Sequence, residues 1–145
     1  MALLAMEQYG LAMIDLISGL QPAGTLKTIA ACLRSGGTPV WLPTAMALGQ
    51  PDIAESWEVT SDSLALWLAQ RLRARGLLLV KAARLPNGAR SAAELAHKGI
   101  IDAAFPRMLA ARDLPCWCIG ARRHREAARA FRTDGDPQAT SISRK

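Results

Sequence analysis

The stretch DIAESWEVTSDSLALWLA, residues 52–69, decides the fold class of this chain. The polar residues 60–63 crowd the first turn of a predicted helix, and Leu64, Trp67 and Leu68 follow at the spacing of one helical face. A helix start exposes backbone N–H groups and a partial positive charge, so it can receive a phosphate group or orient a carboxylate beside one. The same residue types also favour an ordinary N-cap, so both interpretations stay open.

The segments around this helix predict an α/β fold. Residues 38–42 form a short apolar run with Pro39 near its start and Pro43 directly after its end, which indicates a strand. Residues 77–81 are continuously apolar up to Lys81, which is typical of a central parallel strand covered on both faces. With a helix expected over residues 61–75 between them, the two strands predict a βαβ unit, a parallel sheet and a right-handed crossover.

The remaining elements follow from apolar spacing and helix caps. A first helix is expected over residues 2–17, ended by Gly19 and Pro22, and a second over residues 26–33, opened by Thr25. After the βαβ unit, two short helices are expected over residues 91–98 and 102–111, followed by a strand over residues 115–119. A basic helix over residues 122–131 and a turn over residues 134–137 come next.

Several local features qualify these elements. Ser91 and Asp102 are expected to cap the two short helices, and Pro106 to break the second one. The loop over residues 43–60 is long for a compact domain, and long loops in small domains are often functional.

Composition is that of a globular protein. The 145 residues, 50% hydrophobic and 21% charged, predict a single domain over residues 1–145, with residues from about 134 to 145 as a terminal strand and tail. Three cysteines form no disulfide framework, and Cys116 and Cys118 are expected on one face of a strand as buried free thiols. A cytoplasmic location is therefore expected. The apolar N-terminal segment is interrupted by Glu7 and Asp15, so it predicts neither a signal peptide nor a membrane span.

The net charge of +6 comes mostly from residues 121–145. A basic cluster of this kind can bind nucleic acid or other anions, although it is more often a solvated helix face and a frayed terminus. No aromatic residues are interleaved with the arginines in the way that single-strand binding requires. Nucleic acid is therefore an unlikely partner, and a basic nucleic-acid-binding protein is kept only as an alternative.

The run SWEVTSDSLA, residues 56–65, resembles the segment before the nucleotide half of the amino acid kinase superfamily, whose members carry Asn/Ser/Thr-x-Asp-x-x-Ala there. Within the superfamily it looks most like the small kinase of methanofuran-type cofactor synthesis, which acts on aminomethyl-furanmethanol phosphate. Further similar segments are residues 39–43, 77–81, 91–95, 99–106 and 135–142, where Ala139 replaces a glycine of the family's closing strand. The resemblance implies a parallel-sheet α/β/α sandwich of amino acid kinase type.

The chain departs from this family at its glycine-rich loops. The family's first strand with its Lys-x-Gly-Gly-Ser phosphate loop and the second Gly-Gly loop are absent, and the usual Val-Asp-Gly reads Ala82-Ala83-Arg84. The resemblance therefore implies an N-terminally incomplete kinase domain. An uncovered sheet edge or apolar face would follow, so a homo-oligomer is expected.

The family's roles transfer to matching positions. The resemblance implies that Asp62 is the catalytic carboxylate that organises a phosphate-binding lysine and the metal-bound nucleotide. Thr60 and Ser61 would fix the nucleotide-binding loop. Lys81 would bind the cofactor at the carboxyl end of a strand, where open α/β sheets bind ligands; its alternative is a strand-end lysine that reaches solvent.

The acceptor side follows from the same resemblance. Trp57 and Glu58 would bind the substrate, with a packing role for Trp57 between loop and sheet as the alternative. The implied activity is ATP- and Mg²⁺-dependent phosphoryl transfer to a small phosphorylated or carboxylated acceptor in cofactor biosynthesis. The alternative is a catalytically inactive nucleotide-binding remnant or partner subunit.

Overall fold

The computed structural model describes residues 2–83, 85, 88–111, 114–120 and 139–144. It is an α/β structure in which parallel strand pairs predominate. The chain divides into two compact units, Met1–Glu55 and Ser56–Lys145, which are described separately below. Two compact units can belong to one domain or to two, so the assignment of the chain to one kinase-like domain stays a prediction.

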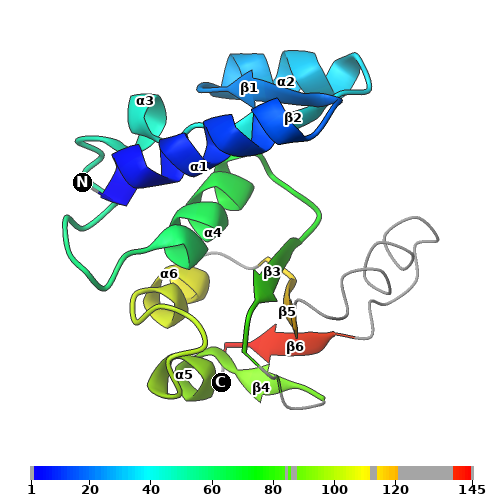
Figure 1. Cartoon of the computed structure of the whole chain (residues 1–145). Helices are drawn as coiled ribbons and strands as arrows, with labels where there is room; N and C mark the ends of the chain where they lie inside the picture. The colour runs from blue at the N-terminus through cyan, green and yellow to red at the C-terminus, as the bar shows by residue number, and fades with distance from the viewer. Residues whose placement is uncertain (1, 84, 86–87, 112–113, 121–138, 145) are drawn as a thin grey trace. The chain divides into compact units, whose positions relative to one another are not determined.

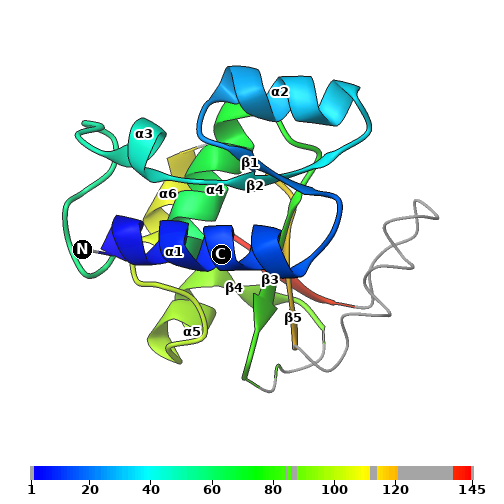
Figure 2. The ribbon, with the colours of Figure 1, turned by 45° about the horizontal axis from the view of Figure 1, so that its top comes forward.

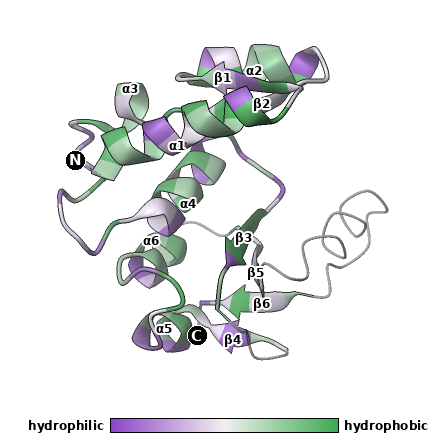
Figure 3. Cartoon of the chain, viewed as in Figure 1, coloured by the Kyte–Doolittle hydropathy of each residue, from purple (hydrophilic) through white to green (hydrophobic). Residues whose placement is uncertain are grey.

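The first unit is a two-stranded parallel sheet with helices around it. The β1–β2 ribbon lies between α1 and α2 (Figure 2). Figure 3 shows that α1 is hydrophobic along most of its length, as its sequence predicts. The elements are α1 (Ala2–Leu16), β1 (Leu20–Ala23), α2 (Leu26–Arg34), β2 (Thr38–Trp41) and α3 (Thr44–Ala47) (Figure 1).

Local signals account for most of this unit. The side chain of Thr25 accepts a hydrogen bond from the backbone N–H of Thr28 at 3.1 Å, which confirms the predicted cap of α2. The predicted long loop over residues 43–60 contains one helical segment, α3. Gly10 is the buried residue of α1, and a Cβ there would lie 2.9 Å from Cδ2 of Leu42. A close approach between helix and sheet therefore explains this glycine.

The strand β1 was not predicted, because Pro22 indicated only the end of a helix. Pro22 instead pairs in register with Val40 of β2. A two-stranded sheet leaves each strand with an unpaired edge, where the missing N–H of proline is tolerated.

The second unit contains a four-stranded mixed sheet. The strand order is β3-β5-β6-β4; β3 and β4 are parallel to their neighbours β5 and β6, while β5 and β6 are antiparallel. The elements are α4 (Ser61–Arg71), β3 (Leu77–Lys81), β4 (Arg90–Ser91), α5 (Ala92–His97), α6 (Phe105–Ala111), β5 (Cys116–Gly120) and β6 (Thr140–Ser143) (Figure 1).

The predicted βαβ unit is wrong. Because β2 and β3 belong to different sheets, α4 does not connect two strands of one sheet. The parallel neighbour of β3 is β5, and α5 and α6 lie between them in the chain. Among the described residues β3 is the terminal strand of its sheet, and Val80 is 57% exposed, so β3 is not a central strand covered on both faces. The antiparallel pair β5–β6 also makes this sheet mixed rather than purely parallel.

Two helix boundaries also differ from prediction. The helix α4 ends at Arg71 rather than Arg75, and Arg73 follows with a positive φ of 50°. The helix α6 begins at Phe105, so Pro106 lies in its first turn, where proline is tolerated, and does not break it.

The core of the second unit forms where α4, α5 and α6 pack against the sheet. Cys116 and Cys118 are both buried, which confirms that they share one face of their strand. The predicted basic helix over residues 122–131 and the turn over residues 134–137 lie outside the described residues. The side chains that make up most of this core are Leu66, Ala69, Leu79, Leu95, Phe105, Leu109, Cys116, Cys118 and Ile142.

Candidate functional site

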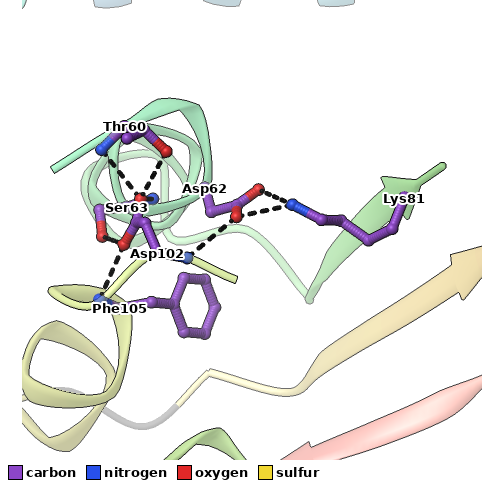
Figure 4. Close-up of polar contacts among 6 residues, drawn as sticks. All are labelled: Thr60, Asp62, Ser63, Lys81, Asp102 and Phe105. Carbon is purple, nitrogen blue, oxygen red and sulfur yellow. Dashed lines mark hydrogen bonds and ion pairs between the residues drawn. The ribbon is translucent and has the colours of Figure 1, made fainter. Parts of the chain in front are cut away.

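An ion pair joins the end of β3 to the start of α4. The ammonium Nζ of Lys81 lies 2.8 Å from Oδ2 and 3.0 Å from Oδ1 of Asp62 (Figure 4). The side chain of Asp62 is 9% exposed and that of Lys81 is 21% exposed. Asp62 is thus largely withdrawn from water, whereas the side chain of Lys81 is partly exposed.

The start of α4 is already occupied by a carboxylate of this chain. Oδ2 of Asp102 accepts hydrogen bonds from the backbone N–H groups of Thr60 and Ser63 at 2.9 Å each, and from the Thr60 hydroxyl at 3.0 Å (Figure 4). The hydroxyl of Ser63 donates to Oδ1 of the same carboxylate. Two of the N–H groups at this helix start, which the sequence suggested for a phosphate, therefore bind Asp102 instead.

The same carboxylate also caps α6, as the sequence predicted. The backbone N–H of Phe105 donates to Oδ1 of Asp102 at 3.0 Å. One side chain therefore holds the starts of two helices that lie far apart in the sequence. The cap on α4 was not predicted.

The two aspartates are directly connected. The backbone N–H of Asp102 donates to Oδ2 of Asp62 at 3.2 Å (Figure 4). Asp62 is therefore oriented by this N–H on one side and by the Lys81 ammonium on the other. The position of Lys81 consequently depends on Asp102 through Asp62.

A pocket of about 450 Å³ opens beside this ion pair. Its size falls in the range of small-molecule sites. The residues that line it are Trp57, Glu58, Thr60, Asp62, Lys81, Gly99, Ile100, Ile101, Asp102 and Ala103.

Most of the residues predicted for the site meet at this pocket. Trp57, Glu58, Thr60, Asp62 and Lys81 line it together, whereas Ser61 is an exposed first residue of α4 and does not. Lys81 ends β3, its ammonium is bound by Asp62 and its side chain is partly exposed, so the alternative of a strand-end lysine that reaches solvent stays open.

Trp57 and Glu58 occupy the rim. The Trp57 side chain is 89% exposed, so the alternative that it packs between loop and sheet is wrong. The carboxylate of Glu58 lies 3.7 Å from Nη2 of Arg107, and both side chains are mostly exposed. Such an exposed pair contributes little to stability.

A buried thiol lies in the core behind the ion pair. Burial raises the pKa of the Cys118 thiol, while the positive charge of Lys81 and a hydrogen bond with Thr140 oppose that rise. The thiol is fully buried and stays neutral at physiological pH. Cys118 is therefore a packing residue and not a nucleophile.

The described residues do not fit a magnesium ion held by the protein alone. No group of three or more His, Cys, Asp or Glu side chains among them is placed to hold a metal ion. The carboxylate of Asp102 is taken up by five hydrogen bonds, which leaves it poorly suited to bind a cation. The other carboxylates that line the pocket are those of Glu58 and Asp62, so Mg²⁺ would need ligand oxygens from elsewhere.

Comparisons with known proteins add no relative. No family model matches the chain, and no curated protein matches it either. The relationship to the amino acid kinase superfamily therefore stays a prediction. Among the described residues, no helix combines the length and the apolar character needed to cross a membrane.

Proposed function

We propose that the pocket beside Lys81 binds the phosphoryl groups of ATP. The second unit would then be the nucleotide-binding part of a phosphotransferase that acts on a small phosphorylated or carboxylated acceptor in cofactor biosynthesis. The observation that carries this proposal is the partly exposed Lys81 side chain, which lies at the carboxyl end of a parallel strand, is held by buried Asp62 and lines a pocket. Ligands of α/β sheets commonly bind at that end of the strands.

The chemistry of the ion pair suits a phosphate ligand. An ammonium group has three N–H donors, and Asp62 accepts two hydrogen bonds from Lys81. Within the described residues this leaves one donor for a ligand oxygen. Because Asp62 is held by the Asp102 N–H as well, the ammonium is positioned before a ligand arrives.

The other charges at the pocket have partners of their own. Glu58 is paired with Arg107, and the Asp102 carboxylate is surrounded by hydrogen-bond donors at the start of α4. Lys81 is paired too, with Asp62, but it is the cationic side chain among the described residues that line the pocket, so an anionic ligand would be recognised through it. A lysine oriented by an aspartate also matches the role that the family resemblance assigns to Asp62, and this agreement supports the proposal.

A second candidate function is nucleotide binding without turnover, either as an inactive protein or as a partner subunit. Phosphoryl transfer relies almost entirely on positioning and charge stabilisation. The residues that line the pocket supply one cationic side chain, and the described residues do not fit a protein-held magnesium ion. This modest set of charges favours binding over catalysis for the described part of the chain.

Two measurements on the full chain separate these functions. Calorimetric titration with ATP and Mg²⁺ reports binding, and ³¹P NMR of ATP with a panel of small phosphorylated and carboxylated acceptors, aminomethyl-furanmethanol phosphate included, reports transfer. Saturable binding with the signals of ADP and of a new phosphoanhydride or acyl phosphate is the result expected for the phosphotransferase. Binding with no new signal establishes the second function, and absence of saturable binding contradicts both.

A further inference from the structure

We propose that Trp57 determines which ligand the pocket accepts, by stacking its indole on a planar ring of a ligand whose anionic group binds Lys81. The anionic half of this inference rests on the proposed function. The shared chemistry is an anion joined to a flat ring, and the ring belongs either to the base of the nucleotide or to an aromatic acceptor phosphate.

The exposure of Trp57 singles it out. Among the large hydrophobic side chains in the described part of the chain it is the most exposed, at 89%, whereas Trp67 of the same unit is 4% exposed. Isolated exposed apolar residues are common on protein surfaces, so exposure alone is no argument. What distinguishes Trp57 is that it lines the pocket that also contains Asp62 and Lys81.

The backbone around Trp57 is held independently of its side chain. The N–H of Glu58 donates to the hydroxyl of Ser56 at 3.2 Å, and the carbonyl of Glu58 accepts from the N–H of Ala104 at 3.1 Å. Two residues later, Thr60 binds Asp102 through both its N–H and its hydroxyl. The indole therefore stands at the pocket rim on an anchored segment, and it is mostly exposed in the described part of the chain.

An indole on an anchored segment is a ready stacking surface. Because the backbone is already held, a ligand ring that covers the indole has to fix only the side-chain torsions of Trp57. Stacking between a base and an aromatic side chain changes affinity by roughly one to two orders of magnitude when the aromatic residue is replaced by alanine. Lys81 supplies the charge that recognises the anion, and Trp57 supplies the discrimination between ligands with and without a ring.

The test compares phosphate ligands that carry a planar ring with phosphate ligands that lack one. Affinities of the full chain are measured by calorimetry for ATP against tripolyphosphate, and for phenyl phosphate against methyl phosphate. The variants are Trp57→Ala, Trp57→Phe, which keeps a ring, and Lys81→Met. Tyr9→Ala is the matched control, since Tyr9 is an aromatic residue of the other unit that is 77% exposed. Circular dichroism checks that each variant is folded.

We expect Trp57→Ala to weaken the ringed ligand about tenfold and to leave its ringless counterpart unchanged, with Trp57→Phe retaining most of the affinity. A loss with ATP alone identifies the nucleobase, and a loss with phenyl phosphate alone identifies an aromatic acceptor. If Trp57→Ala weakens the binding of ligands with and without a ring equally, the stacking role is overturned. The proposed function still stands in that case if Lys81→Met weakens the binding of both kinds of ligand. If ligands with a ring bind through Trp57 but Lys81→Met does not weaken their binding, the proposed function is overturned instead. If no ligand binds, both proposals are overturned.

Discussion

Ser63 and Asp102, 39 residues apart, are joined by two hydrogen bonds: the N–H of Ser63 donates to Oδ2 at 2.9 Å, and its hydroxyl donates to Oδ1. Ser63 is fully buried, so both of its donors would lack a partner without this carboxylate. Asp102 thus ties the start of α4 to the start of α6. Its backbone N–H carries the same restraint to Asp62 and so to the Lys81 ammonium.

Replacing Asp102 by alanine should destabilise the second unit by about 3 kcal/mol, because two helix caps are lost and buried donors are left unpaired. Asp102→Asn retains a side-chain carbonyl as acceptor and should lose about half as much. Urea unfolding gives the free energies, and amide hydrogen exchange should show faster exchange at Thr60 and Ser63 in the alanine variant.

Asp15→Ala is the matched control for this change, since Asp15 is an exposed residue of α1. If Asp102→Ala unfolds at the same urea concentration as Asp15→Ala, then Asp102 does not hold the two helices.

Asp62→Asn should separate stability from anion binding. The substitution replaces the ion pair with Lys81 by a hydrogen bond from the ammonium to a neutral amide oxygen, so we expect a loss of about 1–2 kcal/mol in the free energy of unfolding. It also removes a negative charge 2.8 Å from the ammonium, so tripolyphosphate should bind more tightly. Calorimetry and urea unfolding measure the two effects, and weaker binding of tripolyphosphate would show that orientation by Asp62 matters more than its charge.

The raised pKa of the Cys118 thiol predicts a loss of stability in alkaline solution. Both the folded and the unfolded thiol are neutral below about pH 8.5, the pKa of an exposed cysteine. Above that pH the thiol of the unfolded state ionises while the buried thiol of the folded state stays protonated. Ionisation lowers the free energy of the unfolded state, so the free energy of unfolding falls until the pH passes the raised pKa of the folded state.

Urea unfolding between neutral pH and pH values above that threshold measures this effect. Cys118→Ala should reduce the slope of stability against pH, whatever its effect on stability at neutral pH. An unchanged slope in the variant would assign the alkaline loss to other groups.

Gly76 is required by its neighbours. A Cβ at this position would lie 2.5 Å from Cζ3 of Trp117 and 3.1 Å from the carbonyl oxygen of Pro115. Gly76→Ala should therefore destabilise the second unit by about 1–3 kcal/mol through overpacking. Gly120→Ala is the comparison within the same unit, since a Cβ there would meet its nearest atom at 3.5 Å, an ordinary contact. Equal urea midpoints for the two variants would mean that Trp117 moves aside without cost.

Elements with local signals could be predicted from the sequence. The cap of α2 at Thr25, the start of α4 at Ser61 and the strand β3 from Leu77 each depend on residues within a few positions. The pairing of strands depends on the rest of the chain, which is why β3 was expected at the centre of a sheet. The strand β1 was missed because Pro22 is tolerated only in the edge position that this small sheet provides.

The candidate site was predicted in part for the same reason. The motif placed Asp62, Thr60 and Trp57 close together because they are neighbours in sequence. Lys81 was predicted for the site because it ends an apolar strand, where α/β sheets bind ligands. The role of Asp102 at α4 could not be read from the sequence, because its partners Thr60 and Ser63 lie 42 and 39 residues away. Its cap on α6 was predictable, since Phe105 is three residues away.

The central claim is that Lys81 binds the phosphoryl groups of a nucleotide, and its most direct test is calorimetric titration of ATP into Lys81→Met and Lys27→Met. Both variants lose one lysine charge, but Lys27 is an exposed residue of α2 in the other unit. Lys81→Arg, which keeps the charge beside Asp62, guards against a loss that reflects unfolding. We predict that Lys81→Met weakens ATP binding about tenfold or more, with Lys81→Arg between it and the wild type and Lys27→Met unchanged. Equal affinities in Lys81→Met and Lys27→Met would contradict the claim.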